Sequence, residues 1–201
     1  MRSSPTVWIT GASSGIGKAL AHAWSQRGAR LLLSARRREA LDAVREQCAH
    51  PERHRVLPLD LADPASLHTA VDEATAAHDT IDVLMNNGGI SQRGTAQETQ
   101  LSVVRRIMEV NFFGAVTLIC PGYVRTNVSH NALTEDGSPC GAMSASIRNG
   151  IDPGDCATAI IRAMHEERDE VYIGGVETYA VYLKRLYPAL FNRLIRIIDT
   201  T

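Results

Sequence analysis

The sequence lacks the features that mark several large classes of protein. No apolar run approaches the roughly 20 residues that cross a bilayer, so we expect no transmembrane helix. The 21 lysines and arginines are balanced by 22 aspartates and glutamates, which leaves no bulk attraction to nucleic acid or to an anionic membrane. With 201 residues, 44% of them hydrophobic, the chain suits one folded domain that covers residues 1–201.

Metal-binding and export signals are missing as well. The sequence contains no H-E-x-x-H motif and no Cys/His cluster, so we predict no metal site. Its four cysteines have no C-x-x-C spacing; they are Cys48, Cys120, Cys140 and Cys156. The first residues carry no apolar stretch typical of a signal peptide, so we expect a cytoplasmic protein with reduced thiols.

Short apolar strands and amphipathic helices alternate along the chain. Strands are predicted at residues 6–10, 30–34, 55–59, 81–85 and 171–173, and helices at 16–27, 38–48, 64–77, 99–114 and 153–164. This order predicts an α/β fold, a doubly wound, Rossmann-like parallel sheet with helices on both faces. Residues 127–150 are rich in Ser, Asn and Gly and are predicted to form a mobile loop. A basic and aromatic tail follows over residues 176–201.

The strongest motif lies between the first strand and the first helix. It reads T-G-A-S-S-G-I-G and supplies Thr10, Gly11, Ser13, Ser14, Gly15, Ile16 and Gly17. The glycines let the backbone turn sharply and approach a phosphate, which the free N–H groups at the helix start attract. In this strand–turn–helix setting, the motif predicts binding of a dinucleotide through its diphosphate.

The same stretch matches a second pattern from another class of enzyme. Residues 11–15 also fit G-x-S-x-G, the nucleophile elbow of serine hydrolases, with Ser13 as the nucleophile. That fold takes an oxyanion-hole donor from an earlier strand–helix loop, and the segment before Gly11 has room for one strand only. We therefore disfavour a hydrolase.

Four further segments follow the glycine motif in an order that resembles the short-chain dehydrogenase/reductase family. They contain Asp60 and Leu61, then Asn87, Gly88 and Gly89, then Asn111, and finally Pro121, Gly122 and Thr126. By this resemblance, the first two segments contact the adenosine of the cofactor and the last contacts the nicotinamide carboxamide. Asn111 would hold a water of the proton relay. The resemblance implies an oxidoreductase that transfers hydride between an alcohol/carbonyl pair and a nicotinamide cofactor.

The end of the second strand indicates which cofactor is bound. A carboxylate there would bind the 2′-hydroxyl of NAD, whereas arginine binds the 2′-phosphate of NADP. The sequence has Ala35 at the usual acidic position, followed by Arg36 and Arg37. We therefore predict NADP.

The catalytic serine of the family and its Tyr-x-x-x-Lys pair are missing, and no serine lies between Asn111 and Pro121. No tyrosine has a lysine four residues later, and the lysines of the chain are Lys18 and Lys184. Nine residues separate Asn111 from Pro121, where the family has two strand–helix units of about 60 residues. The sequence therefore resembles a family member with an internal deletion, in which Asn111 is the one retained catalytic residue.

Several expectations follow from this deletion. Residues 115–120 could take the place of the missing strand beside residues 81–85. We expect weak NADP binding, impaired or absent turnover of small alcohols and carbonyls, and loss of the usual homodimer. The alternative is a non-catalytic remnant that binds a nucleotide or a partner. We expect the tail to pack on the sheet or on a partner subunit rather than on a membrane, because Pro188 interrupts its apolar stripe.

Overall fold

The first part of the chain forms a β-α-β unit. The computed structural model describes residues 4–77, 80–95, 97–113, 120–121, 123–166, 172–175, 178–187 and 191. Strand β1 (Thr6–Thr10), helix α1 (Gly15–Gln26) and strand β2 (Arg30–Ser34) follow one another, and the two strands pair in parallel along their whole length. Their side chains are nearly all buried, as expected for strands covered on both faces.

Two more strands complete a four-stranded parallel sheet. Its order is β3-β2-β1-β4, with β3 at Arg55–Val56 and β4 at Val83–Met85. The crossovers are α2 (Arg38–Glu46), a short 3-10 turn η1 (Pro51–Arg53) and α3 (Pro64–Ala77). Pro64 begins α3 as predicted, and the strand order confirms the doubly wound, Rossmann-like fold.

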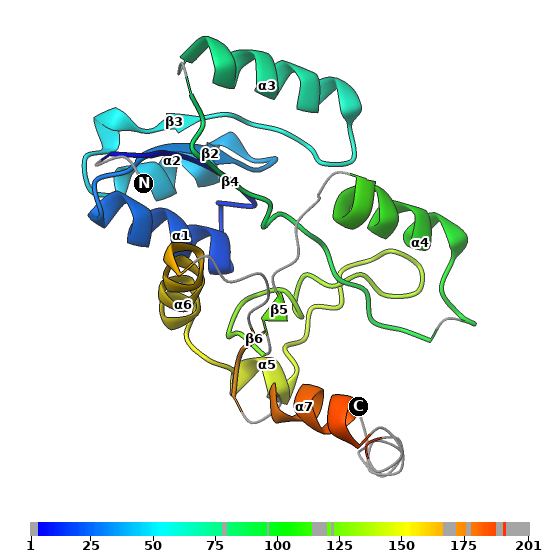
Figure 1. Ribbon diagram of the computed structural model, residues 1–201. Helices are drawn as coiled ribbons and strands as arrows, with labels where there is room; N and C mark the ends of the chain where they lie inside the picture. Colours follow the sequence, from blue (N-terminus) through cyan, green and yellow to red (C-terminus); the bar gives the residue numbers. More distant parts are fainter. Residues whose placement is uncertain are drawn as a thin grey trace.

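Helices cover both faces of this sheet (Figure 1). On one face, Trp8 and neighbouring side chains pack against Ala70 of α3. On the other, the larger part of the core is formed with α1, α2 and helix α6 (Pro153–His165). Helix α6 begins after Asp152, whose carboxylate accepts a hydrogen bond from the N–H of Gly154 (2.8 Å). This cap satisfies one of the backbone N–H groups that have no partner within the helix.

The helix predicted at residues 99–114 is shorter in the structure and changes its winding. Helix α4 spans Leu101–Met108, and the chain then makes a π-helical turn, η2, over Glu109–Phe113. Periodicity predicts one helix here and does not reveal this wider turn, although the family resemblance implies that the asparagine bends its helix. The Asn111 side chain lies in the turn and bonds to the backbone of Ile90.

The strands of the second part form a separate small sheet. Strand β5 (Cys120–Pro121) pairs in parallel with β6 (Tyr172–Ile173), apart from the larger sheet (Figure 1). Of the predicted segment 115–120 the structure describes Cys120, which pairs with Tyr172 and not with β4. On β4, the Leu84 side chain is 51% exposed. The side of β4 that carries Leu84 is therefore only half covered by the described part of the chain.

The segment after β4 gains a partner from the loop at residues 127–150. Leu133 donates its N–H to Ser91 O (2.9 Å) and accepts from the N–H of Arg93 (2.7 Å). Asp136 closes the loop tip by accepting hydrogen bonds from Thr134 Oγ1 and from the N–H of Ser138; these bonds lower the pKa of Asp136 to about 2. The loop is followed by a short helix, α5 (Ala145–Arg148).

The described part of the tail forms helix α7 (Tyr179–Leu186). Its Tyr182 ring meets the Tyr172 ring of β6 edge-on, with centroids 6.1 Å apart. Pro188 lies outside the described residues. Within the part of the chain that the structure describes, no helix has the length and apolar character needed to span a bilayer.

Candidate functional site

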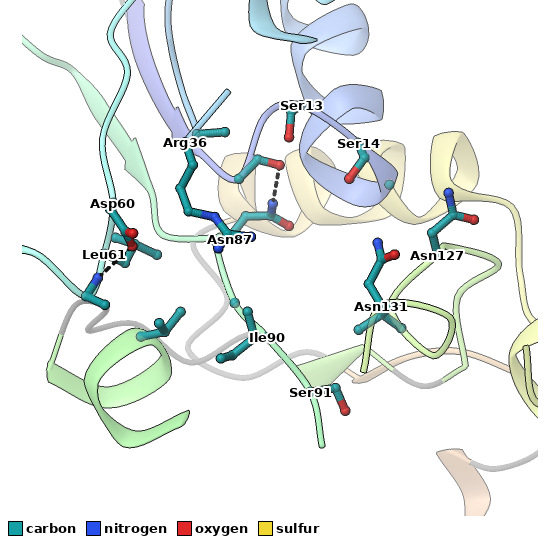
Figure 2. Close-up of a pocket in the computed structure, with 18 of the residues that line it drawn as sticks. Ser13, Ser14, Arg36, Asp60, Leu61, Asn87, Ile90, Ser91, Asn127 and Asn131 are labelled. Carbon is teal, nitrogen blue, oxygen red and sulfur yellow. Dashed lines mark hydrogen bonds between the residues drawn. The ribbon is translucent and has the colours of Figure 1, made fainter. Parts of the chain in front are cut away.

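A cavity of about 850 Å³ opens where the carboxyl ends of β1, β2 and β4 meet (Figure 2). Such an edge is the usual ligand site of doubly wound sheets. Most residues predicted from the motifs lie in its wall: Gly11, Ser13, Ser14, Gly15, Ile16, Arg36, Arg37, Asp60, Leu61, Asn87, Gly88, Gly89 and Thr126. Pro121 belongs to β5 instead, and Gly122 lies outside the described residues.

The glycine turn leaves no room for side chains. Gly11 has a φ of 65°, in the left-handed region that favours glycine, and a Cβ added there would lie 2.7 Å from the Cα of Gly88. A Cβ on Gly17 would lie 2.3 Å from the carbonyl oxygen of Gly11. The turn therefore packs directly against the start of α1 and the segment after β4, with its backbone exposed to the cavity.

Thr10 lies behind this wall and joins two strand ends. Its buried hydroxyl accepts hydrogen bonds from the N–H groups of Asn87 (3.1 Å) and Gly88 (3.0 Å). In return, Nδ2 of Asn87 donates to the carbonyl of Thr10 (3.1 Å). These bonds fix the end of β4 against the glycine turn, so the position of Asn87 in the cavity depends on Thr10.

Arginines dominate the charge of the cavity wall. Arg36 extends from the end of β2 toward Asn87 (Figure 2), and neither Arg36 nor Arg37 forms an ion pair with a described residue. Arg106 of α4 also lines the cavity. The opposing carboxylate in the wall is Asp60, whose Oδ1 accepts a hydrogen bond from the N–H of Ala62 (3.0 Å). This excess of positive charge favours an anionic ligand.

Asn111 supports the cavity from outside its lining. Oδ1 of Asn111 accepts from the N–H of Ile90 (2.9 Å), and Nδ2 donates to the Ile90 carbonyl (2.7 Å). Ile90 itself lines the cavity. The predicted catalytic asparagine therefore fixes the backbone beyond β4, and the two hydrogen bonds explain why an asparagine occupies a helical position.

Four polar lining residues were missed by sequence analysis: Ser91, Arg106, Asn127 and Asn131. Arg106 belongs to no motif, and only the packing of α4 beside the cavity reveals it. The four-residue spacing of Asn127 and Asn131 is a signal that could have been noticed, since that spacing puts two side chains on one face of a helical turn.

The described wall of the cavity offers no general acid or base of the expected kind. None of the five tyrosines and neither lysine of the chain lines it. Lys18 lies on α1 and Lys184 on α7. Among the described residues, no histidine lines it either, so Ser13 has no neighbouring base of the type a serine hydrolase uses.

Comparisons with known proteins agree with this architecture. A family model described as short chain dehydrogenase matches residues 5–119. Dehydrogenase/reductase SDR family protein 7-like of Anopheles gambiae is 32% identical over 255 residues, which cover 92% of this chain and 80% of the relative. Dehydrogenase/reductase SDR family member 7B of Danio rerio is 30% identical over 258 residues, which cover 94% of this chain and 84% of the relative. Both alignments are longer than the 201 residues of this chain, so these relatives contain residues without a counterpart here.

Solved structures show the same fold. A short-chain dehydrogenase from Streptomyces avermitilis superimposes with a TM-score of 0.77 at 23% identity, covering 98% of this chain and 99% of that one. A short-chain dehydrogenase from Sphingobium yanoikuyae, solved in complex with NADPH, gives a TM-score of 0.70 at 18% identity, covering 98% and 97%. At these identities the likeness concerns the fold alone.

Proposed function

The chain belongs to the short-chain dehydrogenase family, and from that premise we propose that it binds NADP(H) without transferring hydride at ordinary enzymatic rates. One observation carries this proposal. The cavity combines a glycine turn shaped for a diphosphate with an arginine-rich wall, and its described lining contains neither tyrosine nor lysine. The chain would therefore bind the nucleotide without the side chains that act on the substrate.

The residues present fit a phosphorylated dinucleotide. The glycine turn, into which no Cβ would fit at Gly11 or Gly17, would hold the diphosphate at the start of α1. Arg36 and Arg37 would bind the 2′-phosphate, while Asp60 and the segment at Asn87 would contact the adenosine. When bound, NADPH supplies a hydride.

The choice of NADP over NAD depends on the end of β2. Among structures of similar fold, the one from Sphingobium yanoikuyae holds NADPH and one from Burkholderia phymatum holds NAD. Here Ala35 and Arg36 line the cavity where a carboxylate would bind a 2′-hydroxyl. Exposed guanidinium groups without a carboxylate partner among the described residues can bind a phosphate in two-pronged geometry.

Loss of turnover follows from the missing acid/base pair. Hydride transfer to a carbonyl requires a proton for the oxygen, and a positioned general acid typically contributes about 10²–10⁴-fold to the rate. The titratable side chains in the described wall are Arg36, Arg37, Arg106 and Asp60. None of these is a tyrosine or a lysine, and Asp60 lies at the end of the cavity assigned to adenosine.

Calorimetric titration with NADPH and NADH tests the binding proposal. We expect wild-type protein to bind NADPH more tightly than NADH. Replacement of Arg36 and Arg37 by alanine should weaken NADPH binding about tenfold or more, because each guanidinium gives charge-assisted hydrogen bonds, and should leave NADH unchanged. Arg38→Ala is the matched control, since Arg38 is exposed and does not line the cavity. Equal affinity of the wild type for both cofactors would contradict the assignment.

A further inference from the structure

The sequence contains two Asn-Gly pairs, Asn87-Gly88 and Asn149-Gly150. In such a pair the backbone nitrogen of the glycine can attack Cγ of the asparagine, because glycine has no Cβ to hinder the approach. A bond forms between that nitrogen and Cγ, and the side-chain amide leaves as ammonia with the proton of the glycine N–H. Water then opens the succinimide ring to aspartate or to isoaspartate, in which the backbone runs through the side-chain carbons. Both pairs have the same chemistry available, so their surroundings decide where it occurs.

Asn87 is held in a way that opposes this reaction. Its Nδ2 donates to the carbonyl of Thr10 (3.1 Å), and the N–H of Gly88 donates to Oγ1 of Thr10 (3.0 Å). The pair is also packed against the glycine turn, since a Cβ added to Gly11 would lie 2.7 Å from the Cα of Gly88. Bringing the Gly88 nitrogen to Cγ of Asn87 would therefore break both hydrogen bonds and open the end of the larger sheet.

Asn149 lies in a segment with few constraints. It follows helix α5, which has four residues and no buried side chain. The Asn149 side chain is exposed and forms no hydrogen bond with a described residue. The N–H of Gly150 donates to the carbonyl of Ile147 (3.2 Å), a bond that closes only the last turn of α5. A helix this short and exposed opens at little cost in free energy, and opening frees the nitrogen that attacks.

These two environments assign the reaction to one of the pairs. When a segment opens and closes fast compared with a slow chemical step, the rate of that step follows the population of the open form. At Asn149 this population depends on the opening of α5, and at Asn87 it depends on the opening of the end of β4. We propose that Asn149 is a site of spontaneous deamidation in the folded protein and that the fold protects Asn87.

The isoaspartate product would disturb a segment that leads to the cavity. It inserts a methylene group into the backbone directly before Gly150, where an added Cβ would already lie 2.3 Å from the carbonyl oxygen of Tyr123. The next residue, Ile151, donates its N–H to that same carbonyl (2.9 Å). This bond holds the segment that runs from Tyr123 to Thr126 in the cavity wall. Formation of isoaspartate should therefore weaken the Ile151 hydrogen bond and loosen that segment.

Peptide mapping by mass spectrometry, during incubation at mildly basic pH, tests the proposal. The folded wild-type protein is the sample, and the same chain unfolded in guanidinium chloride is the control for intrinsic reactivity. In the unfolded chain, the peptides that contain Asn87 and Asn149 should deamidate at similar rates. In the folded protein we expect Asn149 to deamidate about tenfold faster than Asn87 or more, because α5 opens far more readily than the end of β4.

Native-state hydrogen exchange then tests the structural consequence. An isoaspartate-specific methyltransferase identifies the protein molecules that carry the rearranged product, and exchange of the Ile151 amide is compared before and after incubation. We expect this amide to exchange faster in the incubated wild type. Asn149→Gln is the matched control, because it keeps an exposed amide at this position while its cyclisation requires a larger, less readily formed ring. The variant should show no change in exchange at Ile151 over the same time.

Two results would overturn the assignment of the site: deamidation of Asn149 no faster than that of Asn87 in the folded protein, or a folded protein in which both stay intact while the unfolded chain reacts. Unchanged exchange of the Ile151 amide in protein that carries isoaspartate would overturn the predicted loosening of the segment before Thr126. None of these results depends on nucleotide binding, so they test the inference separately from the proposed function.

Discussion

The chain up to Asn87 and, in the chain beyond Asn111, the small sheet with helix α7 differ in how tightly they are packed, whereas α6 joins the core of the first region. In the first region, β1 and β2 pair over five residues each, and their side chains join a core that includes Trp24 and Leu33. In the second, β5 and β6 have two residues each, and α7 exposes Tyr179 and Leu186 to 71% and 72%.

This difference shows which part of the family's function depends on local structure. The glycine turn, the arginines after β2 and the end of β4 all belong to the first region, where continuous strands position them. By the family resemblance, the catalytic tyrosine and lysine come from a segment between the two regions that this sequence lacks. The residues proposed for nucleotide recognition are therefore present in a chain that lacks the Tyr-x-x-x-Lys pair.

The largest difference between the regions should appear in stability. Trp24 is 2% exposed in the core of the first region, so Trp24→Ala should destabilise the protein by about 3–5 kcal/mol. Tyr182 of α7 is 51% exposed, and Tyr182→Ala should cost roughly 1 kcal/mol or less. Urea denaturation of the two variants measures both values. Similar losses of unfolding free energy would show that the second region is packed as well as the first.

How much the sequence predicts also differs between the regions. The apolar strands, the glycine motif and Pro64 are local signals, and each predicted its element in the first region. Because parallel strands end at one edge, the motifs could be expected to meet there, and they do.

The missed features depend on contacts between distant residues. The π-helical turn at Asn111 is held by Ile90, and the loop is held over the cavity by the pairing of Leu133 with Ser91. Neither contact has a periodic pattern. Arg106 faces the cavity only because α4 packs beside it. Sequence patterns could not reveal these partners, since each lies far along the chain from its counterpart or belongs to another element.

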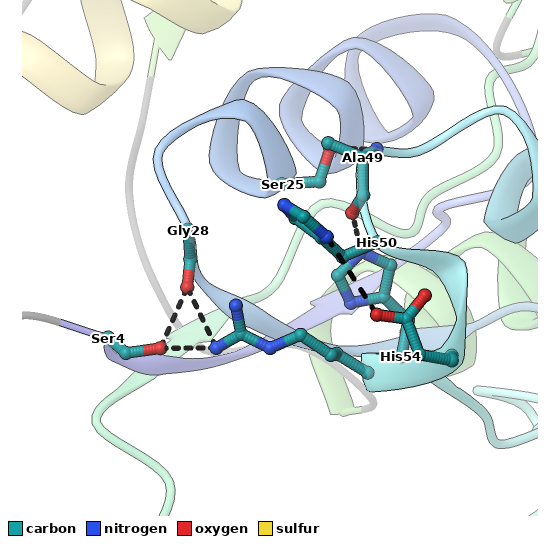
Figure 3. Close-up of polar contacts among 8 residues, drawn as sticks. Ser4, Ser25, Gly28, Ala49, His50 and His54 are labelled. Carbon is teal, nitrogen blue, oxygen red and sulfur yellow. Dashed lines mark hydrogen bonds and ion pairs between the residues drawn. The ribbon is translucent and has the colours of Figure 1, made fainter.

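A smaller effect should appear in how the free energy of unfolding depends on pH, through a buried histidine of the first region. His54 is 4% exposed and lies between the strands and the turn before β3 (Figure 3). Its Nδ1 accepts the N–H of Leu31 (3.3 Å), and its Nε2 donates to the carbonyl of Ala49 (2.9 Å). These bonds require a neutral ring, and burial, the largest cause, lowers the pKa of His54 below its ordinary value.

The sign of the pH effect follows from this lowered pKa. Below pH about 6.5 the unfolded chain binds a proton on His54 that the folded chain resists, so the free energy of unfolding should fall as pH falls toward the folded-state pKa. His54→Gln should reduce this slope. Part of the slope should remain, because burial also lowers the pKa of His22. His68→Gln, at an exposed position of α3, is the control. An unchanged slope in His54→Gln would contradict the assignment.

Binding of NADPH without hydride transfer is tested most directly by one measurement. NADPH consumption is followed with a panel of aldehydes and ketones, using protein that calorimetry has shown to be saturated with NADPH. We predict saturable binding and a rate no faster than the protein-free control. Turnover at ordinary enzymatic rates, about 1 s⁻¹ or more, that is abolished by Asn111→Ala would contradict the claim, because the chain would then contain an acid/base group that the described cavity wall does not show.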